Sequence, residues 1–190
     1  MLYVYLVIIS ILIGLFRKGK LSSLANISLK KMELIILAAL IQAGLVFLGG
    51  RKINFVLNYS AYLLIFSYLL LLYVSWYNKD LKGIRLIAIG IGLNFIVIAA
   101  NHGQMPVLLA SLYKAGLHDF VLTLKEGTYV THVLITDKTL FKFLADVIPL
   151  SSPFPDPSVV SVGDFLMFYG VFNLIQNTML KEELKPEARR

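Results

Sequence analysis

The stretch "AANHGQMPVLLA", residues 99–110, marks the point where a long apolar run gives way to polar and helix-disrupting residues. Residues 84–99, which lead into it, contain only two polar side chains. Gly103 permits a positive φ, and Pro106 disfavours helix at the residue before it. We therefore expect a buried helix to end here and the chain to turn into a different kind of structure.

The composition of the whole chain is that of a membrane protein. Its 190 residues are 58% apolar and their mean hydropathy is +0.78, whereas ordinary globular domains are roughly 45–50% apolar. The formal net charge is +7, but Lys and Arg cluster between apolar runs, which disfavours nucleic acid as a partner. The absence of cysteine excludes disulfides, thiolate metal sites and cysteine nucleophiles.

The apolar residues gather in five runs near the length that crosses a bilayer. We expect an all-α membrane protein, a single integral membrane domain over residues 1–190, with an extracytoplasmic cap at residues 101–158. The expected transmembrane helices cover about residues 2–16, 33–49, 56–77, 84–100 and 159–179.

The distribution of Lys and Arg predicts the orientation in the membrane. Twelve of the 18 Lys and Arg residues lie in the first loop, the third loop and the tail, on one side of the predicted membrane. The positive-inside rule makes that side cytoplasmic. The prediction is a bacterial inner-membrane protein with its N-terminus outside and its C-terminus in the cytoplasm.

The predicted cap contains three weaker patterns. Residues 107–117 are apolar but short, which favours a re-entrant or interfacial helix. Residues 120–136 place Glu126 and Gly127 between two β-prone stretches, which predicts a hairpin. Residues 137–148 have apolar side chains at helical spacing, which predicts an amphipathic helix.

Three amide side chains are predicted near the middle of the membrane. Counted at 1.5 Å per residue, they lie roughly 12–14 Å from the cytoplasmic boundary. Interhelical amides commonly hold helices together, and they also mark ligand or proton sites. This mid-membrane polar layer consists of Gln42, Asn94 and Asn173.

A second group of polar residues is predicted at the outer face. Four interpretations remain open: an acid–base pair of His102 with Asp146 or Asp164; a metal site of His102, His132 and an aspartate, for which no known ligand spacing is present; a headgroup pocket; and a hydrogen-bonded helix break. No metal or cofactor is predicted, and a quinone or lipid is the ligand considered. The candidate pocket residues are Asn101, His102, Gly103, Gln104, Met105, Pro106, His132, Asp146 and Asp164.

Three motifs in order resemble a family of small, uncharacterised bacterial multi-pass membrane proteins, catalogued as a domain of unknown function. The matching positions are Asn101, Gly103, Met105, Pro106 and Val107, then Leu144, Asp146 and Pro149, then Ser161, Gly163 and Asp164. Ala145 stands where that family's pattern has glycine, and His102 falls at a variable position. The resemblance implies a bacterial inner-membrane protein and implies no activity.

The predicted function is an accessory or binding component whose outer-face pocket holds a lipid or quinone. The alternative is a membrane-embedded enzyme acting on an extracytoplasmic or lipid-linked substrate. The expected partners are membrane lipid and another membrane protein.

Overall fold

Five long helices occupy the five apolar runs. The computed structural model describes residues 2–51, 53–127, 129–154 and 156–180, so Lys52 and the four cations of the tail, Lys181, Lys185, Arg189 and Arg190, lie outside the described residues. The long helices are α1 (Leu2–Phe16), α3 (Met32–Gly49), α4 (Asn54–Tyr77), α5 (Ile84–Ala100) and α8 (Val162–Met179), and a short α2 (Ser22–Ala25) follows α1.

Two of these helices are long and apolar enough to cross a membrane. By length and composition, α3 and α4 meet that description, while α1 and α5 are apolar but shorter. A mostly helical protein with at least two apolar helices of membrane-crossing length therefore agrees with the coarse form of the expectation.

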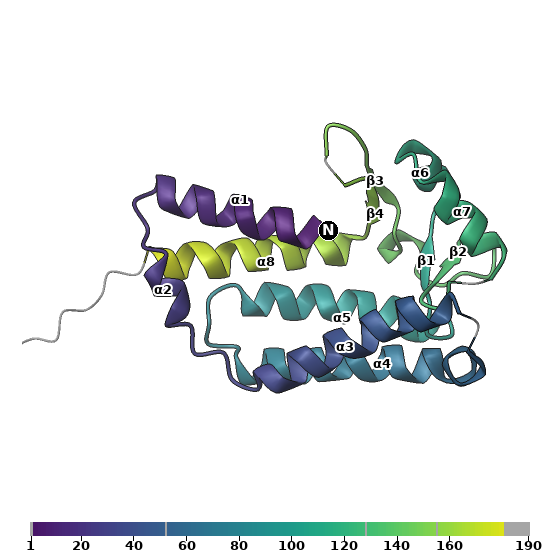
Figure 1. Ribbon diagram of the computed structural model, residues 1–190, viewed down its shortest axis with the longest axis horizontal. Helices are drawn as coiled ribbons and strands as arrows, with labels where there is room; N and C mark the ends of the chain where they lie inside the picture. Colours follow the sequence, from purple (N-terminus) through teal and green to yellow (C-terminus); the bar gives the residue numbers. More distant parts are fainter. Residues whose placement is uncertain (1, 52, 128, 155, 181–190) are drawn as a thin grey trace, which may run out of the picture.

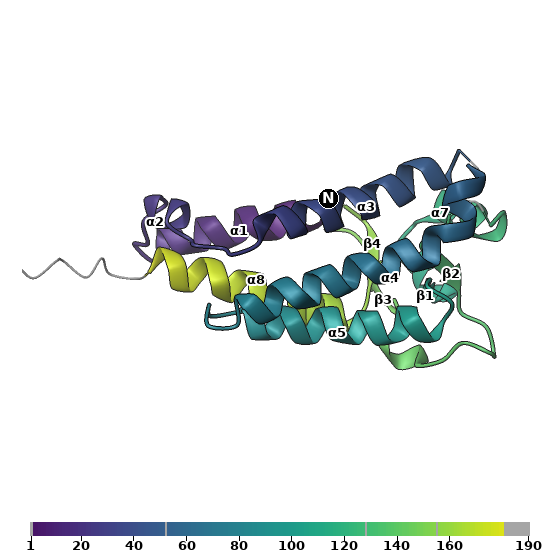
Figure 2. The ribbon, with the colours of Figure 1, turned by 90° about the horizontal axis from the view of Figure 1, so that it is seen from below.

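The long helices form a curved row (Figures 1 and 2). α1 packs against α8, α8 against α5, α5 against α4, and α4 against α3. Within the described residues, the two helices at the ends of this row, α1 and α3, share no extensive contact. The row therefore has an inner side, faced by α3, α4, α5 and α8, and its two end helices are not packed extensively against each other.

Glycines allow a close approach between α5 and α8. A side chain at Gly90 would collide with the carbonyl oxygen of Gly163, and one at Gly83 would collide with that of Gly170. Gly90, Asn94 and Val97 lie on one face of α5 and are buried. The glycine pairs Gly90–Gly163 and Gly83–Gly170 let the two backbones pack directly together.

The two described segments rich in Lys and Arg lie at the same end of the row. The Asn78 side chain at the end of α4 accepts a hydrogen bond from the backbone N–H of Lys30 and donates one to its carbonyl, both at 2.9 Å. Residues 17–31 and 79–85 are thus held together, and Figure 1 shows the cap at the opposite end.

The cap contains short strands as well as helices, so the all-α expectation is corrected. Strands β1 and β2 pair in parallel, β3 and β4 pair antiparallel, and the helical elements lie between them. The cap elements are β1 (Met105–Val107), α6 (Leu109–Lys114), α7 (His118–Lys125), β2 (His132–Leu134), the 3₁₀ turn η1 (Lys142–Leu144), β3 (Ile148–Leu150) and β4 (Ser158–Val160).

The short helix expected within residues 107–117 is present as α6. The hairpin predicted at residues 120–136 and the amphipathic helix predicted at residues 137–148 are wrong. The first half of the expected hairpin is helix α7, in which Val121 and Leu124 share a buried face. Its acidic first turn and basic last turn also suit the helix dipole. The strand that follows, β2, pairs with the distant β1 instead.

The expected amphipathic helix at residues 137–148 is reduced to the single turn η1. The Asn101 side chain takes both backbone groups of Leu140, accepting from its N–H and donating to its carbonyl at 3.0 Å each. Those groups would otherwise continue a helix. The side chain that ends α5 therefore also prevents a helix here.

The last helix begins at Val162, after β4, and not at residue 159. Ser161 is its N-cap: its hydroxyl accepts from the Asp164 backbone N–H at 3.0 Å, and the Asp164 carboxylate accepts from the Ser161 N–H at 2.9 Å. This reciprocal capping box fixes the position of the Asp164 carboxylate.

Candidate functional site

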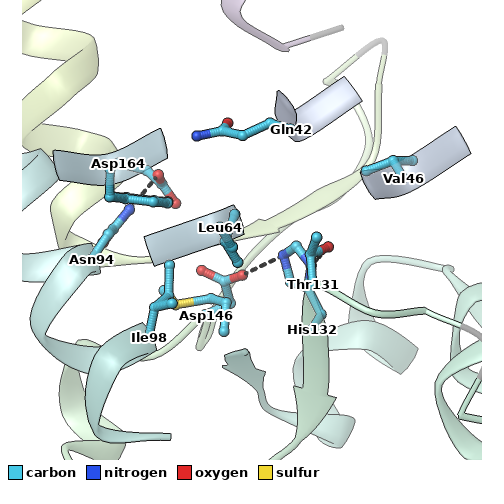
Figure 3. A pocket seen from close by; sticks show the side chains of 11 residues that line it. Gln42, Val46, Leu64, Asn94, Ile98, Thr131, His132, Asp146 and Asp164 are labelled. Carbon is cyan, nitrogen blue, oxygen red and sulfur yellow. Dashed lines mark hydrogen bonds and ion pairs between the residues drawn. The ribbon is translucent and has the colours of Figure 1, made fainter. Parts of the chain in front are cut away.

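A cavity of about 160 Å³ lies on the inner side of the row, where the cap meets the helices. Figure 3 shows Asp146 and His132 together, with Asn94 and Asp164 forming a separate group. Four long helices and three cap segments contribute to the wall. The lining residues are Gln42, Val46, Leu64, Tyr68, Asn94, Ile98, Met105, Thr131, His132, Asp146 and Asp164.

Asp146 is held by backbone hydrogen bonds on both of its sides. Its N–H donates to the Pro106 carbonyl at 3.0 Å, and its own carbonyl accepts from the Leu108 N–H at 2.9 Å. The residue is only 6% exposed. Its Oδ2 lies 3.5 Å from His132 Nε2, whereas Oδ1 is buried without a hydrogen-bond partner.

This environment shifts the titration of Asp146. Burial raises the pKa of the carboxyl above its usual range, because a charge is poorly solvated there. The hydrogen bond and the charge of His132 lower the pKa again, and the charge of Asp164 raises it. Asp146 is thus a buried acid with one satisfied and one unsatisfied oxygen.

His132 connects Asp146 to Thr131. Parallel pairing of β1 and β2 brings Thr131 beside Met105, whose N–H donates to the Thr131 carbonyl at 2.8 Å. The Thr131 hydroxyl lies 2.9 Å from His132 Nδ1. When Asp146 is ionised and His132 is neutral, Nε2 carries the ring proton and donates to the carboxylate, and Nδ1 accepts from the Thr131 hydroxyl. The result is a hydroxyl–imidazole–carboxylate chain at the cavity.

The second polar group joins the middle of α5 to the start of α8. Asn94, 3% exposed, donates to Asp164 Oδ1 at 3.0 Å and accepts from the Ser161 hydroxyl at 2.8 Å. Asp164 Oδ2 accepts from Ser161. Both carboxylate oxygens of Asp164 therefore have partners, in contrast to those of Asp146.

Gln42 reaches the cavity from α3. Its amide donates to the Ser67 hydroxyl at 3.0 Å, and that hydroxyl donates to the Leu64 carbonyl at 2.7 Å. This links α3 to α4 close to the cavity wall.

A second cavity of about 160 Å³ lies in the cap and reaches His132 and Asp146 from the other direction. Its wall is mainly apolar and includes Val107, Leu112 and Phe120. The His132–Asp146 pair therefore stands between a cavity in the helix row and a cavity in the cap.

The structure brings together six of the predicted residues, from both predicted groups. Gln42 and Asn94 of the mid-membrane layer line the same cavity as four outer-face candidates: Met105, His132, Asp146 and Asp164. Asn173 does not line it.

The other candidates shape the turn instead of lining the cavity. Asn101 caps α5 by donating to the Val97 carbonyl at 2.8 Å, and Gln104 donates to the Val130 carbonyl at 3.3 Å. Gly103, with φ of +77°, packs against Ala61, while His102 is exposed. Pro106 contributes its carbonyl to Asp146.

The sequence analysis missed Thr131 and Tyr68. Thr131 precedes His132 directly, and Tyr68 is a polar aromatic near the middle of an apolar run, far from the interface where tyrosine is common. Either position could have been noticed on those grounds. Among the described residues, no three His, Asp or Glu side chains gather in the manner of a metal site.

Comparisons with known proteins give a family and no activity. The profile of the family described as "Family of unknown function (DUF5317)" matches residues 26–176, which include every residue of the cavity wall. An uncharacterized protein of Thermotoga maritima is 36% identical over 105 residues, 55% of this chain and 56% of that protein. The alignment thus spans about half the length of each. No solved structure matches.

Proposed function

Because the chain belongs to the Family of unknown function (DUF5317), its activity must be inferred from its own residues, and we propose that it is a multi-pass membrane protein that binds a lipid-borne headgroup. In this proposal all five long helices cross a bacterial inner membrane, with the cap on the outer face. The headgroup carries a hydroxyl and occupies the cavity, as in a quinol or a hydroxyl-bearing lipid.

The membrane placement is supported by the surface of the helix row. Large apolar side chains are exposed along the outer sides of the helices, among them Leu40 at 65%, Phe47 at 62% and Phe16 at 93%. Continuous apolar surface of this kind is stable in lipid and costly in water. The segments at residues 17–31 and 79–85 carry eight Lys and Arg residues at the end opposite the cap, which supports a cytoplasmic location for that end.

The single observation that carries the ligand assignment is the unpartnered Asp146 Oδ1. A buried polar atom without a hydrogen-bond partner lowers the stability of the fold by about 1–3 kcal/mol, and by more if it is charged. Asp146 Oδ1 is such an atom, and Asp146 lines the cavity. When Asp146 is ionised, its Oδ1 only accepts hydrogen bonds, so the missing partner of this form is a donor. A quinol or lipid hydroxyl supplies a donor, whereas the carbonyls of an oxidised quinone do not.

Size and access agree with this ligand. A cavity of about 150 Å³ holds one benzene ring, so the observed 160 Å³ accommodates a headgroup of that size. In this proposal, a molecule with an apolar tail enters from the bilayer between α1 and α3, the two end helices of the row, which share no extensive contact.

Purification in mild detergent tests the proposal. Lipid extraction and mass spectrometry of the wild-type protein should identify a bound quinol or hydroxyl-bearing lipid, and its mass distinguishes the two. The Asp146→Asn protein should retain about one tenth of the wild-type amount of ligand or less, because the Asn amide replaces one acceptor by a donor. Asp137→Asn, the same change at an exposed cap position, is the matched control and should retain wild-type amounts.

Two results contradict the proposal. One is a correctly folded wild-type protein that carries neither class of molecule and shows no thermal stabilisation by an added short-chain quinol or lipid. The other is equal ligand retention by Asp146→Asn and Asp137→Asn.

A second candidate function, a membrane-embedded enzyme acting on a lipid-linked substrate, is favoured by the Thr131–His132–Asp146 chain. The 2.9 Å contact allows His132 Nδ1 to remove the Thr131 hydroxyl proton as the Thr131 oxygen attacks the carbonyl carbon of an ester substrate. The ester C–O bond then breaks, His132 returns the proton to the leaving alcohol, and water hydrolyses the acyl group from Thr131. The wild-type protein should then convert a component of a bacterial lipid extract, and Thr131→Val should bind that component without converting it. Unchanged lipids after incubation with wild type exclude this candidate.

A further inference from the structure

A groove at the other end of the protein, unrelated to the cavity, has the properties of a phospholipid site. It lies between the end of α4 and the start of α5 and encloses about 540 Å³. One part of its wall is apolar, formed by Leu72, Ala88 and Ile89, and the other part carries Lys79 and Arg85.

The two cations are held in place by the short connection between α4 and α5. Lys79 Nζ lies 4.4 Å from the centre of the Trp76 ring, and Arg85 Nε donates to the Lys79 carbonyl at 3.4 Å. Directly before Lys79, the buried Asn78 is fixed to Lys30 by two hydrogen bonds. These contacts bring both cationic side chains to the wall of the same groove.

The charges near the groove favour an anion. Lys79, Lys82 and Arg85 lie within seven residues that contain one acidic side chain, Asp80. Trp76 is 68% exposed at the helix end, as expected for a side chain at the level of lipid headgroups. A partner with a negative head and an apolar tail complements both parts of the groove.

We propose that this groove binds one anionic phospholipid of the inner leaflet, with its phosphate between Lys79 and Arg85 and an acyl chain along Leu72, Ala88 and Ile89. The inference rests on the membrane placement proposed above and is independent of the ligand in the cavity. Anionic lipid is attracted to clusters of Lys and Arg just cytoplasmic of a transmembrane helix.

Native mass spectrometry of the purified full-length protein tests the site. Phosphatidylglycerol should bind more tightly than phosphatidylcholine with the same acyl chains, and raising the salt concentration before analysis should weaken this preference. Removing each cation, as Lys79→Gln and Arg85→Gln, should weaken phosphatidylglycerol binding on the order of fivefold. The control is the double change Lys114→Gln and Lys125→Gln, two exposed cap cations, which should leave binding unchanged.

Every outcome decides the inference. Equal binding of the two phospholipids, or equal loss in the groove and cap variants, overturns it. Displacement of phosphatidylglycerol by millimolar inorganic phosphate also overturns it, because the site would then recognise phosphate alone. If the groove variants do not fold, the inference is tested on the wild-type protein, by its preference for phosphatidylglycerol over phosphatidylcholine and by the weakening of that preference with salt. Because the glycerol hydroxyls of phosphatidylglycerol also suit the cavity proposed above, Lys79→Gln and Arg85→Gln are repeated in the Asp146→Asn protein, where a further loss of phosphatidylglycerol binding reports on the groove alone.

Discussion

Asp146 is a costly residue for this fold to bury. Its carboxylate is almost removed from solvent, yet only one oxygen faces a partner, the His132 ring at 3.5 Å. Asp164 on the same cavity accepts hydrogen bonds at both oxygens. A buried acceptor left unsatisfied lowers stability, so its presence favours a role in binding over a role in holding the cap.

The raised pKa of Asp146 predicts a pH-dependent stability. The folded protein holds this proton more tightly than the unfolded chain, so protonation stabilises the fold. That stabilisation is complete below the ordinary value of 3.8 and is lost as the pH rises through the raised pKa. The melting temperature of delipidated wild type should therefore fall relative to that of Asp146→Asn as the pH increases over this interval.

The measurement is thermal unfolding in mild detergent at a series of pH values. Asp137→Asn should give a curve parallel to that of wild type, because its side chain is exposed. Parallel curves for wild type and Asp146→Asn would contradict the shifted pKa.

The pairing of α5 with α8 is the element that assembles one half of the site. Gly90 and Gly163 bring the backbones together one helical turn away from Asn94, which then reaches both Ser161 and Asp164. The capping box aims the Asp164 carboxylate, and the glycine contact fixes its distance from α5. A change at either place should disturb the other.

Gly90 and Gly92 form a matched pair for testing this contact. A Cβ at Gly90 would collide with Gly163 and come within 2.7 Å of the Met167 Cγ, whereas a Cβ at Gly92 meets nothing within 4 Å. Gly90→Ala should therefore lower the free energy of unfolding by about 1–3 kcal/mol. Gly92→Ala should be neutral or stabilising by up to about 1 kcal/mol, since alanine favours helix. Denaturation in mild detergent measures both, and equal effects would exclude the close contact.

At this scale the sequence predicted the long helices well and the cap poorly. Apolar runs are a local property, so the helix bounds agree to within a few residues, apart from the three residues that β4 and Ser161 take from the start of the last one. The cap depends on distant partners: residues 105–107 pair with 132–134, and Asn101 takes the backbone groups of Leu140. Such contacts leave no periodic signal, which is why a hairpin and a helix were predicted there.

In the whole molecule, residues of the predicted mid-membrane layer and of the predicted outer-face group line one cavity. Gln42 and Asn94 lie near the middle of α3 and α5, and Thr131, His132 and Asp146 of the cap line the same cavity. In the membrane placement proposed above, the cap therefore reaches below the outer face. Irregular backbone at such a depth is tolerated only when protein surrounds it or water fills the space. The curved helix row supplies that cover. The depths counted from the sequence placed the mid-membrane layer and the outer-face group apart, because the cap was expected to stay at the outer face.

The orientation can be tested on a chain that lacks cysteine. Lys125→Cys, at the end of α7, should react in intact cells with a maleimide reagent that cannot cross the inner membrane. Lys82→Cys, in the exposed connection between α4 and α5, should react only after the membrane is opened. The reverse pattern would place the cap in the cytoplasm, and reaction of both in intact cells would mean that α5 does not separate two compartments.

The packing of α1 against α8 has a consequence for biosynthesis. α1 precedes the other four long helices in the chain, yet it packs against α8, which follows them: Gln176 donates to the Ser10 carbonyl, and the Lys20 N–H donates to the Met179 carbonyl. Until α8 is made, α1 lacks its extensive helix contact and Asn94 lacks its aspartate. In the membrane placement proposed above, insertion of α8 is therefore the step that both pairs α1 and completes the wall of the cavity.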